Sequence, residues 1–170
     1  MTITMREGGP ADVPLVLRMF DSAVAWLAAQ GRTGQWGSSP WSEDPAAVAK
    51  IEKYVAHGVL WIAEADGEPA AALVLADSPA HYVAPADEPE RYIQILTSDR
   101  RFQGHGAGAA LIAHAVEETR RAGVSLLRVD CYAGDDGKLV AFYEKNGFAP
   151  AESFSVGEKE WPGLVLTRRV

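Results

Sequence analysis

The sequence has 170 residues, of which 48% are hydrophobic and 23% charged, so we expect residues 1–170 to form one compact domain. These proportions exclude an intrinsically disordered chain, and 16 glycines with 10 prolines are too few for a collagen-like one. A net charge of −7 repels phosphate backbones and anionic lipids, so we expect neither a nucleic-acid partner nor a membrane partner.

The predicted elements alternate between helices and strands. Helices are indicated by apolar residues at steps of three and four, and strands by short apolar runs between turn residues. In chain order they are a strand at 2–6, helices at 12–30 and 44–57, strands from 59, 69 and 91, a helix at 104–122, a strand from 124, a helix at 138–146, and strands at 148–156 and 163–169. This order, βααβββαβαββ, predicts a mixed sheet with helices on its faces.

The single cysteine and the N-terminal segment bear on location. Cys131 cannot form a disulfide within the chain, so the fold does not depend on an oxidising compartment. The first twelve residues lack the pattern of a secretion signal, and no stretch approaches the roughly 18 apolar residues of a membrane span. We therefore expect a soluble, cytoplasmic protein.

A glycine-rich turn precedes the helix at 104–122, with Gln103, Gly104, Gly106 and Gly108 in the pattern Q-G-x-G-x-G. Glycines let a backbone approach a ligand closely, and a helix start supplies unpaired amides and a positive dipole end. Such a turn can hold a phosphate or pyrophosphate, although it can also be a tight connection. It lacks the lysine of a P-loop and follows the fourth strand instead of the first, which argues against both common nucleotide-binding motifs.

Two motifs make the chain resemble the GCN5-related N-acetyltransferase (GNAT) superfamily. Gln103, Gly106 and Gly108 match its Q/R-x-x-G-x-G/A signature after the fourth strand, and residues 141–148 (AFYEKNGF) match a short tyrosine-bearing helix. The order of elements agrees over nearly the whole chain. The resemblance implies a single GNAT domain of α/β (α+β) class, with a mixed central sheet of about seven strands flanked by four helices.

The resemblance also implies a co-substrate, acetyl-CoA, with its pyrophosphate on the turn and its pantetheine along a fourth strand that splays from the fifth. The implied cofactor-binding residues are Leu96, Thr97, Ser98, Gln103, Gly104, His105, Gly106, Ala107, Gly108, Ala109 and Asp136. Tyr143 matches the tyrosine that protonates the departing CoA thiolate, although an aromatic there can also be packing. The histidines and the cysteine form no ligand-spaced cluster, so we expect no metal.

The general base is left open by one departure from the family. Many members carry a glutamate nine residues before the turn, where this chain has Gln94, whose amide can orient water or substrate but does not titrate. Candidate bases are Asp130, Asp136, His81 and Glu64, each also explicable as a solvated or structural residue. The alternative is an amine that reaches the site already neutral.

The acceptor is expected to be a small-molecule primary amine. In the family the loop between the first two helices lines the acceptor pocket, so Trp36 and Trp41 are candidate substrate residues with Gln94, although they can equally be packing. Residues 1–90 carry 13 acidic against 5 basic side chains, and residues 91–170 carry 10 against 11, which predicts a cationic acceptor. The alternatives are acetylation of protein N-termini or lysines, and a non-catalytic module that senses acyl-CoA. The sequence leaves the oligomeric state open, and a homodimer through the last strands is an arrangement that the family resemblance allows.

Overall fold

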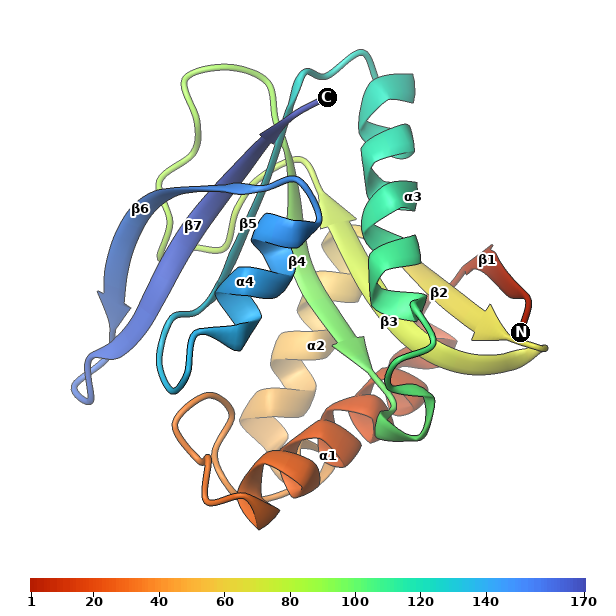
Figure 1. Cartoon of the computed structure of the whole chain (residues 1–170), viewed down its shortest axis with the longest axis vertical. Helices are drawn as coiled ribbons and strands as arrows, with labels where there is room; N and C mark the ends of the chain where they lie inside the picture. Colours follow the sequence, from red (N-terminus) through yellow and green to blue (C-terminus); the bar gives the residue numbers. More distant parts are fainter.

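A computed structural model describes residues 1–170 and confirms the mixed α/β fold. Seven strands form one sheet in the order β1-β2-β3-β4-β5-β7-β6, in which only the β4–β5 pair is parallel. The strands are β1 (Ile3–Glu7), β2 (Val59–Ala65), β3 (Glu68–Ala76), β4 (Arg91–Ser98), β5 (Leu126–Tyr132), β6 (Ala149–Val156) and β7 (Trp161–Arg169). The helices are α1 (Val13–Ala29), α2 (Pro45–His57), α3 (Ala107–Arg121) and α4 (Lys138–Lys145), so the predicted order is confirmed (Figure 1).

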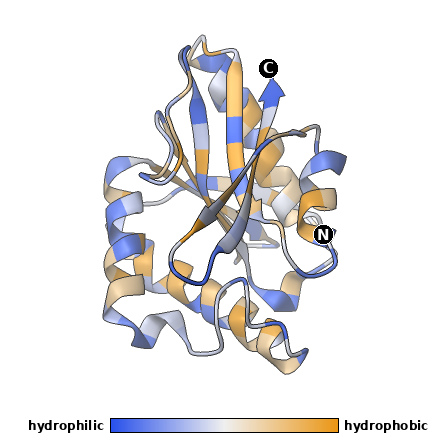
Figure 2. Ribbon diagram, turned by 90° about the vertical axis from the view of Figure 1, so that its left-hand side faces the viewer, coloured by the Kyte–Doolittle hydropathy of each residue, from blue (hydrophilic) through white to orange (hydrophobic).

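The two faces of the sheet carry separate hydrophobic cores. Helices α3 and α4 lie in front of the sheet in Figure 1, whereas α2 lies behind it. Leu73 and Leu111 are fully buried on the α3 side, and Ile51 and Ile62 are buried beneath α1 and α2. The helices alternate between hydrophobic and hydrophilic residues along their length (Figure 2), which is typical of helices that bury one face. No helix is long and apolar enough to cross a lipid bilayer.

Helix α3 begins three residues later than the sequence predicts. Gly104 and Gly106 have φ angles of 82° and 81°, in the left-handed region that a right-handed helix cannot contain. The first helical residue is therefore Ala107, and the glycine-rich segment is a turn with its own conformation.

A β-bulge changes which way β4 presents its side chains. Ile95 pairs with Val74 and Ile93 with Leu75, so Gln94 is an extra residue without a partner on β3. In a regular strand, Ile93 and Ile95 would lie on the same face. Here Ile93 belongs to the α3-side core and Ile95 to the α1–α2 side, and Gln94 lines a cavity at this point.

Strands β4 and β5 separate after a short paired stretch. Their pairing is limited to Arg91–Ile93 against Leu127–Val129, although β4 continues to Ser98 and β5 to Tyr132. Figure 1 shows the two strands diverging beyond this point. The facing edges at residues 94–98 and 130–132 therefore lack a strand partner, and an extended ligand can bind to such an edge.

A buried ion pair fixes the loop between β3 and β4. Arg128 donates from Nε to Oε1 of Glu90 at 2.7 Å and from Nη2 to Oε2 at 2.9 Å, and the two side chains are only 9% and 4% exposed. Arg128 Nη2 also donates to the carbonyl of Ala84, and Glu90 accepts from the amide of Ala86. This network anchors residues 77–90, the loop that carries Tyr82 to the cavity described next.

Candidate active site

Two cavities meet where β4 and β5 separate. One has a volume of about 310 Å³ and lies between α1, α2 and the sheet. The other has a volume of about 600 Å³ and follows the glycine-rich turn. We call the first the aromatic cavity, because eight aromatic side chains line it, and the second the turn cavity. Six residues line both cavities, and they are Gln35, Trp36, Leu96, Tyr132, Leu139 and Tyr143.

The turn cavity presents a row of free backbone amides. Five amides make no hydrogen bond within the protein, and they belong to Gly104, Gly106, Ala107, Gly108 and Ala109. The positive φ of Gly104 and Gly106 shapes this row, and α3 adds the positive end of its dipole. The arrangement is suited to an anion with several oxygen atoms.

Ten of the eleven predicted cofactor-binding residues line the turn cavity. They are Leu96, Thr97, Ser98, Gln103, Gly104, Gly106, Ala107, Gly108, Ala109 and Asp136. The exception is His105, which does not line it and whose Nδ1 lies 2.8 Å from the sulfur of Met1. Asp136 lies at the edge of the cavity in an ion pair with Arg32, at 2.9 Å between Oδ2 and Nη2.

Four cationic side chains line the turn cavity, against two carboxylates. The cations are Arg32, Arg100, Lys138 and Lys145, and the carboxylates are Asp135 and Asp136. Arg100 stacks on the ring of Trp26 at 3.5 Å, and its buried Nε and Nη2 have no hydrogen-bond partner. Burial lowers the pKa of Arg100, so its unpaired donors favour an anionic ligand. No local sequence signal indicates Arg32, which joins the site from the loop after α1.

Tyr143 stands where the two cavities join. It is 4% exposed, lies near the end of α4, and packs edge-on against Phe142 and Phe148 with centroid distances of 5.3 and 5.8 Å. Burial raises the pKa of its hydroxyl, and nearby Cys131 and Asp130 raise it further. The hydroxyl therefore retains its proton at neutral pH and can act as a donor.

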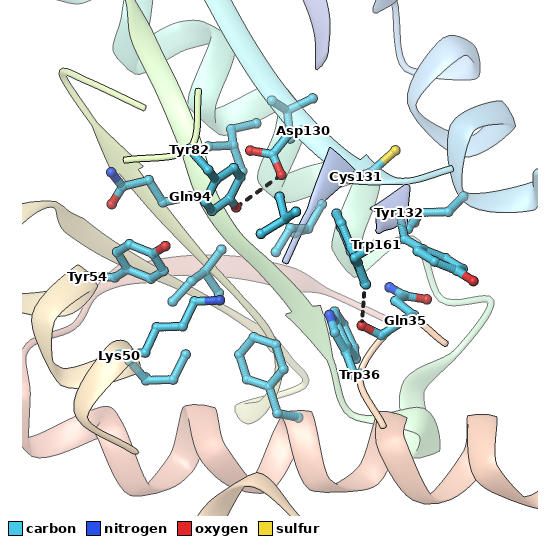
Figure 3. A pocket seen from close by; sticks show the side chains of 18 of the residues that line it. Gln35, Trp36, Lys50, Tyr54, Tyr82, Gln94, Asp130, Cys131, Tyr132 and Trp161 are labelled. Carbon is cyan, nitrogen blue, oxygen red and sulfur yellow. Dashed lines mark hydrogen bonds between the residues drawn. The ribbon is translucent and has the colours of Figure 1, made fainter. Parts of the chain in front are cut away.

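Two predicted substrate residues form one wall of the aromatic cavity. Trp41 stacks parallel to Phe20 at 4.4 Å, Trp36 meets Phe20 edge-on at 5.0 Å, and Trp41 Nε1 donates to the carbonyl of Trp36. Both tryptophans pack against the core beneath α1 and α2, which confirms the packing interpretation, and because they also line the cavity, their contact with a substrate stays a prediction. Trp161 Nε1 donates to the Gln35 carbonyl at 2.9 Å, which joins β7 to the α1–α2 loop across the cavity (Figure 3).

Tyr132 is held between two glycines. A side chain at Gly34 or Gly134 would overlap the Tyr132 ring, so both positions require the smallest residue. Gly134→Ala should lower the free energy of unfolding by about 1–3 kcal/mol, because the added methyl group would overlap the Tyr132 ring and force it out of its position. Urea denaturation measures this, with Gly9→Ala as a control at a glycine that faces open space. Equal effects of the two substitutions would contradict the steric explanation.

Asp130 is the only one of the four candidate bases that lines the aromatic cavity. Its carboxylate accepts hydrogen bonds from Tyr92 at 2.6 Å and Tyr82 at 3.3 Å (Figure 3 shows the latter). Burial raises the pKa of Asp130, and the two tyrosine bonds oppose this rise. The others are placed elsewhere, since Asp136 is in the turn cavity, Glu64 is paired with Arg6, and His81 is exposed.

The remaining polar groups of the aromatic cavity are Gln94 and Lys50. Gln94 donates from Nε2 to the Ser78 carbonyl at 3.0 Å, and its buried Oε1 has no partner. None of the 13 acidic residues of segment 1–90 lines either cavity. The charge asymmetry of the sequence therefore does not extend to the cavity, which weakens the argument for a cationic acceptor. No three His, Cys, Asp or Glu side chains come together as metal ligands.

Comparisons with known proteins agree with this geometry. The family model described as Acetyltransferase (GNAT) family matches residues 23–148. The uncharacterised N-acetyltransferase YesJ of Bacillus subtilis is 28% identical over 166 residues, covering 84% of this chain and 87% of that protein. IAA acetyltransferase from Bacillus cereus superposes with a TM-score of 0.70 at 19% identity, covering 99% of this chain and all of the other. Ribosomal-protein-alanine N-acetyltransferase from Brucella melitensis gives 0.69 at 17% identity, covering 98% and 99%. At these identities the two structures show a shared fold.

Proposed function

The chain belongs to the GNAT family and is an N-acetyltransferase, and we propose that it transfers the acetyl group of acetyl-CoA to a primary amine of a small molecule. The observation that carries the proposal is the position of Tyr143, at the junction of the turn cavity, which suits an anion, and the aromatic cavity. The turn cavity takes the co-substrate, the aromatic cavity takes the acceptor, and the two substrates meet between β4 and β5.

The residues of the turn cavity fit the co-substrate that the family uses. The five free amides from Gly104 to Ala109 suit a pyrophosphate, and the unpaired donors of Arg100 suit a further phosphate oxygen. The unpartnered edge of β4 at Leu96–Ser98 offers hydrogen bonds to the amide groups of pantetheine. A bound acetyl-CoA supplies the activated acyl group, and the protein supplies its placement.

The proposed chemistry needs few protein groups. The neutral amine nitrogen attacks the thioester carbonyl carbon, and a free amide of β4 near Leu96 stabilises the oxyanion. The carbon–sulfur bond then breaks, and Tyr143 donates its proton to the leaving sulfur. The nitrogen loses one proton as the amide forms, and this proton restores the tyrosine. Gln94 orients the acceptor or a water molecule through its unpaired Oε1.

Gly106→Val should raise the Kd for acetyl-CoA about tenfold or more, because a β-branched residue is strained at a φ of 81° and the amide row would shift. Gly123→Val is the matched control, since Gly123 has a φ of 73° just beyond the other end of α3. Titration calorimetry with acetyl-CoA measures both. If the two variants weakened binding equally, the turn would have no special role.

A small-molecule acceptor is favoured over a protein acceptor by the walls of the aromatic cavity. Trp36, Trp41 and Trp161 line it, and the hydrogen bond from Trp161 to Gln35 joins two of its walls, which restricts the room for a peptide chain. A volume of about 310 Å³ is at the small end of ligand sites. Acetylation of protein N-termini or lysines is therefore the second candidate.

Release of CoA with a panel of amines tests the proposed function. Acetyl-CoA is supplied with amino acids, aminoglycosides, polyamines, arylalkylamines and a set of peptides, the free thiol is measured, and mass spectrometry identifies the acetylated product. The expected result is release that depends on a small amine. Release with peptides alone would favour the protein acetyltransferase. Tight acetyl-CoA binding without release by any acceptor would favour an acyl-CoA sensor, the alternative that Gln94 supports.

Three further expectations belong to this proposal. Residues 1–170 act as one catalytic domain, which the participation of both β1 and β7 in a single sheet supports. Homodimers form through the last strands, where β6 is an exposed sheet edge. The protein works in the cytoplasm, which its single free cysteine suits.

A further inference from the structure

Lys50 places a positive charge at the aromatic cavity without a protein partner for it. The residue comes from α2, and its Nζ lies 5.7 Å from the ring centroid of Trp41 and 5.8 Å from that of Tyr54. These rings position the ammonium but do not neutralise it. Although the residue as a whole remains exposed, burial of the ammonium end lowers the pKa of Lys50, and attraction to Asp130 opposes this. An anionic group on a ligand would compensate the free-energy cost of holding this ammonium group without an anionic partner.

Asp130 places the opposite charge in the same cavity. It comes from β5, and the bonds from Tyr92 and Tyr82 fix its two oxygens. Lys50 and Asp130 do not form an ion pair with each other, since Asp130 is bonded only to the tyrosines. Figure 3 shows the two side chains entering the cavity from different elements. The cavity thus holds one separated pair of opposite charges within largely apolar walls.

We infer that the acceptor carries a carboxylate as well as its amine, the carboxylate pairing with Lys50 and the amine lying against Asp130. The acceptor is then a small amino acid or amino-acid-like molecule with an apolar or aromatic body. This inference rests on the proposed function and narrows its acceptor. The ammonium and the carboxylate of the bound ligand satisfy both protein charges, and the ammonium gives up one proton, to Asp130 or to solvent, before its nitrogen attacks. A polyamine would instead bring a second cation towards Lys50.

The other groups around the cavity leave this pairing intact. Tyr54 and Tyr82 face Asp130 from α2 and the β3–β4 loop, and burial raises the pKa of each hydroxyl, so both stay neutral. Tyr92 and Tyr143 likewise have raised pKa values, and burial raises the pKa of Cys131 to about 12. Arg128, the remaining nearby cation, is paired with Glu90. Lys50 and Asp130 are therefore the charges that a ligand meets.

Matched acceptors test the inference. Phenylalanine, phenylalaninamide and phenethylamine share a ring and an amine but differ in the carboxylate, and 4-aminobutyrate, butylamine and spermidine repeat the comparison with a longer spacing. The measurement is kcat/KM for CoA release at saturating acetyl-CoA. In at least one series the carboxylate-bearing acceptor should exceed its relative without a carboxylate by about tenfold or more, the effect of one charge-assisted contact.

Variants assign the contact to a residue. Lys50→Met should remove the preference for the carboxylate while leaving the Kd for acetyl-CoA unchanged, and Lys50→Arg should retain most of it. Lys53→Met is the matched control, because Lys53 is on the same helix, is exposed, and lines neither cavity. Asp130→Asn should lower kcat/KM for every amine, with or without a carboxylate.

The outcomes distinguish a failure of the carboxylate inference from a failure of the proposed function. Turnover of the amines without a carboxylate, spermidine included, at least as fast as the carboxylate-bearing acceptors would overturn the inference and leave the proposed function standing. An unchanged preference in Lys50→Met would do the same. No release of CoA with any acceptor, together with normal acetyl-CoA binding, would overturn the proposed function and the inference with it.

Discussion

Tyr143→Phe should release CoA about 10²–10⁴ times more slowly than the unaltered protein while binding acetyl-CoA with the same Kd. The substitution removes one hydroxyl from a side chain that is 4% exposed, and the ring can keep its contacts with Phe142 and Phe148. The thiolate would then depart without a proton donor beside it. Single-turnover kinetics and calorimetry separate the slowed step from binding.

Tyr132→Phe is the control for this prediction. Tyr132 also lines both cavities, so its hydroxyl is in the same junction. We expect a much smaller change in rate, because its ring lies between Gly34 and Gly134 and we assign its hydroxyl no proton transfer. A large loss in Tyr132→Phe with none in Tyr143→Phe would show that the acid was assigned to the wrong tyrosine.

Arg128→Leu should lower the free energy of unfolding by about 3–5 kcal/mol, since Glu90 would remain buried with an unpaired charge. The Ala84 carbonyl would also lose its donor. Urea denaturation followed by circular dichroism measures the change. Because the network anchors the loop that carries Tyr82, we also expect Asp130 to lose the hydrogen bond that Tyr82 donates to it.

Arg169→Leu provides the comparison for an exposed ion pair on the same loop. Arg169 pairs with Glu88, and these side chains are 67% and 40% exposed. Exposed pairs contribute about 0–1 kcal/mol, so this variant should remain close to the unaltered stability. Similar losses of unfolding free energy in both variants would mean that burial of the ion pair does not determine how much its removal destabilises the protein.

The order of elements and the glycine-rich turn could be predicted because their signals are local. Helical periodicity, the glycines of 104–108 and the AFYEKNGF motif are each contained within a short segment. The start of α3 was placed too early, because a run of small residues does not reveal which glycine adopts a positive φ. The sequence indicated the turn but did not show that the turn extends to Gly106, the residue before the first helical one.

The walls of the aromatic cavity could not be predicted from the sequence in the same way. Trp161 meets Gln35 across 126 positions, and Arg32 meets Asp136 across 104. The bulge at Gln94 depends on the register with β3, and the charge on Lys50 matters only because Asp130 shares its cavity. No single segment contains such information. The overall charge asymmetry counts side chains without placing them, so it does not indicate which charges line the cavity.

The six residues shared by the two cavities make the two binding events interdependent. A ligand in either cavity contacts Leu96, Tyr132 and Tyr143, so it becomes part of the surface that the second ligand meets. The binding free energies are then linked, and the factor by which acetyl-CoA changes the affinity for the acceptor equals the factor by which the acceptor changes the affinity for acetyl-CoA. If acetyl-CoA and the acceptor occupy these cavities as proposed, we expect acceptor affinity to differ between the protein alone and the protein with acetyl-CoA bound.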